Sequence, residues 1–331
     1  MTNNTSRSDS VHWSNEKEVV NGSLPVSFLI LLVRILPFPI LSLLTLIVSF
    51  FYYFSSKRAR IDAENYQNHL IAWQKENNKP SLNKSAVFKQ IFSFALALVE
   101  QVAAWTGKLK YDDIVFVDDD SKELKENVSS GKGAVILFSH LGSMSCLRAF
   151  ANKQQMGVKR VLPLCILADT KMSAIFNKEI RKQNPLFDMN IVNSEEFDIS
   201  GFMRFQNTVE RGGIVTIAAD RTSEKSPDKI VKCSFLGMEA PFPYGSFLLA
   251  LLLEVPVYYV FSIRSKTFML HPKYNMFVKK ATVLPEYYDL LSRTEKKASV
   301  RALCREFVST MESMVTQYPF QWYNFFDFWG Q

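Results

Sequence analysis

The sequence predicts an α/β protein with a mixed, largely parallel sheet flanked by helices and with an N-terminal membrane-associated helix. Apolar runs of strand length alternate with helical stretches between residues 134 and 263, a pattern typical of a sheet that helices cover on both faces. A long apolar segment precedes them near the N-terminus. With 331 residues, 47% of them hydrophobic and 21% charged, the chain can bury a substantial core.

The first 60 residues divide into a polar part and an apolar part. Residues 1–23 form a tail rich in Ser and Asn, and residues 24–60 form a helical segment that we expect to associate with a membrane. The stretch 35–54 is uncharged for twenty residues, which is long enough to cross a bilayer. Because Pro37 and Pro39 interrupt it near its start, a kinked or partly inserted helix fits equally well, and a buried helical hairpin is the alternative.

Positive charge follows the apolar segment directly. Lys57, Arg58 and Arg60 predict that the remaining α/β domain, residues 61–331, stays on the cytoplasmic side of the membrane. The net charge of +7 suits an anionic membrane or an acidic protein. We expect no nucleic-acid partner, because the sequence has neither a zinc-finger pattern nor a basic motif interleaved with aromatic residues.

The expected elements follow from apolar runs and helical spacing. Four cysteines without paired spacing predict neither a disulfide framework nor a zinc site, and Cys146, Cys165 and Cys304, which lie in apolar or helical contexts, are expected to be buried. The aspartates of 118–120 predict a solvated turn in preference to a metal site. Strands are expected in the run that ends before His140 and at 161–167, 189–192, 214–219 and 256–263, and helices at 86–106, 172–181, 201–211, 246–253 and 299–317.

His140 is the candidate around which the chain is organised. A glycine-bounded apolar run ends at this residue, which places the imidazole at the carboxyl end of a buried strand, where open α/β sheets bind ligands. Gly142 permits close backbone approach, and Ser143 or Ser145 can cap the helix expected next, so that free amides point into the same space. A neutral imidazole is suited to act as a general base.

Asp220 and Arg221 follow a second expected strand, so we expect them at the same edge of the sheet, beside His140. Arg221 has the geometry to grip a phosphate or carboxylate with two hydrogen bonds. A salt bridge between structural elements is the alternative for both residues.

Several motifs resemble those of the lysophospholipid acyltransferase superfamily, in the form of the bacterial lipid A biosynthesis (lauroyl/myristoyl) acyltransferases. The segment from His140 to Ser145 resembles the family's histidine, four residues and carboxylate, with serine in place of the carboxylate. The resemblance covers roughly residues 12–329. Further matches follow in the family's order: Ala219-Asp220-Arg221, Phe235-Leu236-Gly237 with the block from Pro241 to Gly245, Val255-Pro256-Val257, and the block from Tyr318 to Phe326.

The resemblance implies a glycerolipid acyltransferase-like fold and an acyltransferase activity. Such an enzyme would move an acyl group from an acyl carrier protein or coenzyme A thioester to a hydroxyl or amine of a lipid or glycolipid. It would work at the cytoplasmic face of the bacterial inner membrane and need no metal, nucleotide or redox cofactor. His140 would be the base, amides near Gly142 and Ser143 would hold the oxyanion, and Arg221 would bind an anionic part of a substrate. Gly237 belongs to the block that would shape the substrate channel, with a folding turn as the alternative.

Ser145 leaves the role of the family's carboxylate open, because a hydroxyl accepts a hydrogen bond but carries no charge. Three alternatives follow. In the first, another acid, Asp220, Asp169 or Asp198, orients His140; in the second, substrate binding and oxyanion stabilisation sustain activity without it. In the third, the chain is a non-catalytic lipid-binding or assembly relative. A nucleophilic Ser143 or Ser145 is not favoured, since no Gly-x-Ser-x-Gly elbow surrounds them. For the aromatic C-terminus we expect closure of the core, with covering of the acyl slot and membrane contact as alternatives.

Overall fold

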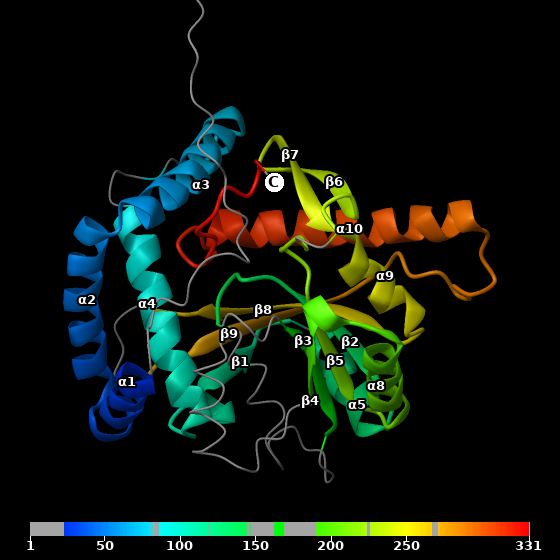
Figure 1. Cartoon of the computed structure of the whole chain (residues 1–331), viewed down its shortest axis with the longest axis horizontal. Coiled ribbons are helices and arrows are strands. Elements are labelled where there is room, and N and C mark those ends of the chain that lie inside the picture. Colours follow the sequence, from blue (N-terminus) through cyan, green and yellow to red (C-terminus); the bar gives the residue numbers. More distant parts are fainter. Residues whose placement is uncertain are drawn as a thin grey trace, which may run out of the picture.

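A seven-stranded sheet with helices on both faces forms the centre of the computed structural model (Figure 1). The structure describes residues 23–80, 82, 86–118, 120–143, 146, 162–168, 190–223, 226–266 and 271–330. The strand order is β1-β9-β8-β2-β5-β3-β4, and every pair is parallel except β8–β9. This confirms the expected α/β class with a mixed, mostly parallel sheet. The strands are β1 Ile114–Phe116, β2 Ala134–Phe138, β3 Leu164–Ala168, β4 Asn190–Asn193, β5 Ile214–Ala218, β8 Val257–Arg264 and β9 Tyr274–Lys280.

The β2 strand lies in the middle of the sheet and is buried along its whole length. Its side chains alternate between two cores. Val135 and Leu137 face one that also contains residues of the helices α9 (Tyr244–Leu252) and α10 (Arg293–Gln317), whereas Ile136 and Phe138 face one with residues of α4 (Ala86–Trp105) and α5 (Asp120–Ser129). Burial on both faces explains the continuous apolar run. The helices are α1 Ser23–Ile35, α2 Phe38–Ser55, α3 Lys57–Glu76, α4 Ala86–Trp105, α5 Asp120–Ser129, α8 Ile199–Glu210, α9 Tyr244–Leu252 and α10 Arg293–Gln317.

The N-terminal apolar segment forms two helices, because Pro37 stands before the first residue of α2 and interrupts the run. Both helices pack on α4, with α2 at the outer edge of the molecule (Figure 1). The inner face of α2 is buried, and its outer face leaves large apolar side chains in solvent. By length and composition, α2 and the stretch 86–104 of α4 are long and apolar enough to cross a membrane, which on its own is weak support for membrane association.

The α4 helix behaves as a core helix. Most of the stretch that is long and apolar enough to cross a membrane is buried inside the protein, and the helix expected at 86–106 is present. Glu100 on this helix lies 2.7 Å from the Nε atom of Arg264 on β8, and both side chains are buried. A buried ion pair to the sheet ties α4 to the domain.

The structure also contains elements that the sequence analysis did not predict. The strands β1 and β9 and the helix α5 were missed. Residues 230–243, which include part of the block expected to shape the substrate channel, form a hairpin of β6 Ile230–Phe235 and β7 Met238–Pro243. The aspartates Asp118 and Asp120 are structural, since their carboxylates accept the backbone N–H groups of Val278 and Lys280 on β9. The helix expected at 172–181 lies outside the described residues.

All four cysteines are buried and free, which confirms the burial expected of Cys146, Cys165 and Cys304 and adds that of Cys233. Cys233 and Cys304 nevertheless meet in space, with their Sγ atoms 3.6 Å apart between β6 and α10. Their separation along the chain concealed this contact.

Candidate functional site

His140 and Asp220 lie side by side at the carboxyl edge of the sheet. The strands β2 and β5 pair in parallel, and their last residues, Phe138 and Ala218, are register partners. His140 and Asp220 each follow two residues later. The register of the two strands therefore brings the imidazole and the carboxylate together, at the edge where ligands bind in such sheets.

The Asp220 carboxylate holds His140 at two points. Oδ1 lies 2.8 Å from His140 Nδ1, and Oδ2 accepts the backbone N–H of His140 at 2.8 Å. The carboxylate side chain is only 2% exposed, whereas the imidazole side chain is 28% exposed. This geometry favours the tautomer in which Nδ1 donates to Asp220 and Nε2 keeps its lone pair.

The electrostatics of the pair favour a neutral imidazole beside an ionised carboxylate. Burial lowers the pKa of His140, the positive charge of Arg221 lowers it further, and Asp220 opposes both. For Asp220, burial alone would raise the pKa, but His140, Arg221 and the hydrogen bonds from His140 outweigh it and leave the pKa below its usual range. At neutral pH the site therefore presents an unprotonated nitrogen, as a general base requires.

The loop after His140 is pressed against β8. Gly142 has a φ of +80° and forms a bridge with Ser262, and a Cβ atom at this position would lie 2.0 Å from the Ser262 carbonyl oxygen. The Gly142 N–H donates to the carbonyl of Gln321 at 2.8 Å, and the Ser143 N–H donates to that of Ser262 at 2.7 Å. The expectation that these two amides hold an oxyanion is not met in this structure, because both already have carbonyl partners.

The C-terminal segment completes the site, which the sequence analysis did not foresee. Trp322 is buried, and its indole Nε1 donates to Asp220 Oδ2 at 3.1 Å. The Tyr323 N–H donates to the His140 carbonyl at 2.9 Å, and Leu141 bridges Trp322. The density of aromatic residues indicated core closure, and the core does close here, but no pattern in the sequence links this indole to Asp220.

The remaining residues predicted for the site lie close to the His140–Asp220 pair, away from it, or outside the described residues. Arg221 is half-buried, with its guanidinium carbon 5.8 Å from the centre of the Phe326 ring. Gly237 is not part of the cluster: it occupies the β6–β7 turn at a φ of +77°, and a Cβ atom there would face Trp73 and Glu76 of α3.

Of the other acids considered as partners of His140, Asp198 caps α8, where it accepts the N–H of Gly201. Ser145 and Asp169 lie outside the described residues. Asp220 is thus the acid that the structure places against the imidazole.

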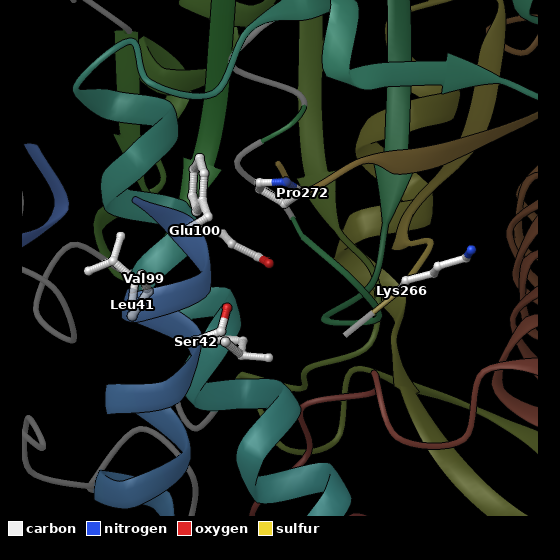
Figure 2. A pocket seen from close by; sticks show the side chains of 8 residues that line it. Leu41, Ser42, Val99, Glu100, Lys266 and Pro272 are labelled. Atoms are coloured by element: carbon white, nitrogen blue, oxygen red, sulfur yellow. The ribbon is translucent and has the colours of Figure 1, made fainter. Parts of the chain in front are cut away.

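A small pocket lies away from this pair, between α2, α4 and the connection of β8 to β9 (Figure 2). Leu41 and Ser42 line it from α2, and Glu100 lines it from α4. Neither His140 nor Asp220 contributes to its wall, so we do not assign it to the chemistry of the pair. Within the described residues, no group of three or more His, Cys, Asp or Glu side chains is arranged to hold a metal ion.

Neither a scan against protein-family models nor a search of curated proteins found a match to this chain.

Proposed function

We propose that the protein is an acyltransferase that moves an acyl group from a carrier-protein or coenzyme A thioester to a hydroxyl or amine of a lipid or glycolipid. The observation that carries the proposal is the His140–Asp220 pair, a partly exposed imidazole oriented by a buried carboxylate. Two further points support it: the ordered motifs that resemble the lipid A acyltransferases, and the apolar outer face of α1 and α2.

Asp220 would take over the role of the carboxylate that Ser145 replaces. A base in acyl transfer needs a partner that fixes its tautomer and stabilises the imidazolium. Asp220 contacts Nδ1 directly and is held in turn by Trp322 and by the His140 backbone. The base and its acid would therefore follow two different strands, β2 and β5, whereas the family's motif places the histidine and the carboxylate five residues apart.

The reaction would proceed through one proton transfer in each direction. Nε2 of His140 removes the proton of the acceptor as its oxygen or nitrogen attacks the thioester carbonyl. The tetrahedral intermediate collapses, the carbon–sulfur bond breaks, and the imidazolium returns its proton to the departing thiolate. Arg221, which stands next to Asp220 in the chain, is the candidate to bind a phosphate or carboxylate of either substrate.

The outer face of α1 and α2 supports a membrane location for this chemistry. The side chains of Val48 and Phe51, three residues apart on α2, are 64% and 68% exposed. Contiguous exposed apolar side chains of this kind are uncommon on a soluble protein. Because the inner face of α2 packs on α4, we propose that α2 lies along the bilayer with its outer face inserted, and does not cross it. The exposed apolar residues of the two helices are Phe28, Leu31, Ile35, Ile40, Leu43, Leu44, Ile47, Val48, Phe50, Phe51 and Phe54.

A vesicle flotation assay tests this membrane face. We expect the wild type to float with vesicles of mixed zwitterionic and anionic lipid, and the double variant Val48→Glu/Phe51→Glu to stay in the soluble fraction. The matched control is Ile199→Glu/Leu290→Glu, which places the same charges at exposed apolar positions on α8 and before α10. Equal loss of flotation in both variants would contradict the assignment.

The activity itself is tested by His140→Ala in a purified assay with a lauroyl thioester and membrane lipids from a Gram-negative bacterium as acceptor. We expect product formation with the wild type and its loss in the variant, with vesicle binding unchanged, because His140 lies far from the membrane face in the sequence and is not one of its residues. The ring is 28% exposed, so the fall in melting temperature should be small beside the loss of activity. Product formed at the wild-type rate by His140→Ala would overturn the proposal.

A second function, a non-catalytic lipid-binding or assembly role, is favoured by one observation. The Gly142 and Ser143 amides, expected to stabilise the oxyanion, are both engaged. Absence of wild-type turnover with any acyl thioester would favour this second function. If the wild type does turn over, the variant Ser145→Glu distinguishes an impaired enzyme from a rearranged site. A rise in turnover by orders of magnitude would mark the natural chain as an impaired enzyme, whereas a fall would show that Ser145 belongs to an active, rearranged site.

A further inference from the structure

A row of positive side chains runs along the N-terminal half of α10. Arg293, Lys297, Arg301 and Arg305 are all exposed and recur every four residues. Positions four apart lie on the same side of a helix, separated by about 6 Å along its axis. The four charges therefore form one continuous stripe, which we name the α10 stripe.

The carboxylates of α10 all accept hydrogen bonds from groups outside the stripe. Glu295 closes the capping box with Ser292, and Glu306 accepts from the Tyr259 hydroxyl on β8. Glu312 accepts the N–H of Leu236 in the hairpin turn. Within the described residues, no salt bridge engages a member of the α10 stripe.

The stripe does not help the helix to form. Positive charges near a helix N-terminus oppose the macrodipole, and like charges four residues apart repel by about 0.2–0.5 kcal/mol per pair. Arg293 and Lys297 stand in the first two turns of α10. Helix stability therefore does not account for the stripe, and its exposed charges are accessible to an external partner of negative charge.

The position of the stripe indicates whether its negative partner is a membrane or an acidic protein. The N-terminal half of α10 and the apolar face of α1 and α2 lie at opposite ends of the long axis of the molecule (Figure 1). A bilayer that holds α1 and α2 therefore does not reach the stripe. The partner that fits is a soluble acidic protein.

The stripe is connected to the candidate site through its own helix. From Arg305 to the end of α10 at Gln317 the helix rises by about 18 Å. The chain then passes directly to Trp322, which contacts Asp220. The helix that carries the stripe therefore leads along the chain into the segment that contacts Asp220.

We propose that the α10 stripe docks the acidic carrier protein that delivers the acyl thioester. The inference rests on the proposed acyl transfer and deepens it, because it selects a carrier protein over coenzyme A as the donor. Electrostatic complementarity of this kind mainly accelerates encounter and fixes orientation. The docking does not require turnover, so binding can be measured separately from catalysis.

The test measures binding of a fluorescently labelled bacterial acyl carrier protein by anisotropy and, in parallel, turnover of the same acyl chain on the carrier protein and on coenzyme A. For the triple variant Lys297→Glu/Arg301→Glu/Arg305→Glu we expect at least a tenfold weaker Kd and an equal loss of kcat/KM with the carrier protein. We expect kcat/KM with the coenzyme A thioester to change less than twofold. The wild-type Kd should weaken as salt is raised.

The matched control is Lys75→Glu/Lys79→Glu/Lys132→Glu, which makes the same change in net charge at exposed positions away from α10. It should bind the carrier protein as the wild type does. Circular dichroism checks that α10 still folds, and the neutral triple variant with Gln at the same α10 positions repeats the test without like-charge repulsion.

Wild-type affinity in both stripe variants, or equal loss in the control, would overturn the docking site. Either result with transfer still dependent on His140 would leave the proposed function standing. Conversely, tight stripe-dependent binding without any transfer would support docking while contradicting the enzyme.

Discussion

Two buried carboxylates near the edge of the sheet have opposite surroundings. Glu100 is paired with Arg264, which also donates to the Ser93 hydroxyl and carbonyl and to the Tyr323 hydroxyl, and both charged side chains are sealed from solvent. Asp220 is equally buried, but its partner His140 remains partly exposed. Both side chains of the first pair are shielded from solvent, although Glu100 also lines the small pocket between α2 and α4, whereas the second pair opens to solvent on the side of the imidazole.

The difference separates structural from chemical use of the same residue type. The buried Glu100–Arg264 ion pair holds α4 to β8, so the loss of either charge lowers the free energy of unfolding. In the second pair, the buried carboxylate instead influences the tautomer and the pKa of an imidazole whose other nitrogen a substrate can reach. Substitutions in the Glu100–Arg264 pair should therefore change mainly the free energy of unfolding, and substitutions in the His140–Asp220 pair mainly the activity.

The largest effect is expected for Asp220→Asn. The amide keeps the shape but loses the charge and favours the wrong imidazole tautomer, so turnover should fall by about 10⁴. The urea midpoint should change much less than the activity does. A steady-state assay and an unfolding curve on the same preparation make the comparison, and a loss of activity below tenfold would show that Asp220 is not the partner of the base.

The next largest effect is expected for Glu100→Gln, on stability. Removing the charge leaves Arg264 buried without its counterion, which costs about 3–5 kcal/mol in the free energy of unfolding. Urea denaturation measures the loss. If the variant is as stable as wild type but inactive, the two carboxylates do not divide their roles as described.

Gly142→Ala tests the loop between the two pairs, since Gly142 rests on Ser262, two residues before Arg264 on β8. Positive φ and the approach to the Ser262 carbonyl should together destabilise the protein by about 2–4 kcal/mol and displace His140. Gly131→Ala is the control: its φ is +86°, but nothing lies within 4 Å of the added Cβ atom, so only about 1 kcal/mol should be lost. Equal losses in the two variants would show that the close approach to β8 does not matter.

The smallest effect is expected for Trp322→Phe, which keeps an aromatic ring but removes the hydrogen bond to Asp220. With one donor fewer, Asp220 stabilises the imidazolium more strongly, so the pKa of His140 should rise from its lowered value. Activity needs neutral His140 and is lost as pH falls through this pKa. The acid limb of the pH–rate profile should therefore move to higher pH in the variant, with plateau turnover reduced by about tenfold or less. An unmoved acid limb would reduce Trp322 to a packing residue.

Five of the seven strands of the sheet, all but β1 and β9, and the neighbouring positions of His140 and Asp220 could be predicted from the sequence because strand ends are local features. Glycines and apolar runs mark β2 and β5, and parallel strands end at one edge. Trp322 could not be predicted as a donor to Asp220, since it lies 102 residues away and its contact depends on how the C-terminus folds back.

The short strand β1 and the sealed pair of Glu100 and Arg264 were missed for related reasons. Three residues give too little periodicity to mark a strand. A charged residue in an apolar helix does not name its partner on a distant strand. The amides of Gly142 and Ser143 were misjudged because the sequence does not show which carbonyls approach a loop.

The central claim is that Asp220 holds His140 with its proton on Nδ1 and its lone pair on Nε2. Nitrogen-15 NMR of the histidine rings, assigned by comparison with His140→Ala, measures this tautomer directly at neutral pH. We predict a protonated Nδ1 and a bare Nε2 for His140 in the wild type, and loss of that preference in Asp220→Asn. A proton on Nε2 in the wild type, or spectra for His140 that are identical in the two proteins, would contradict the claim.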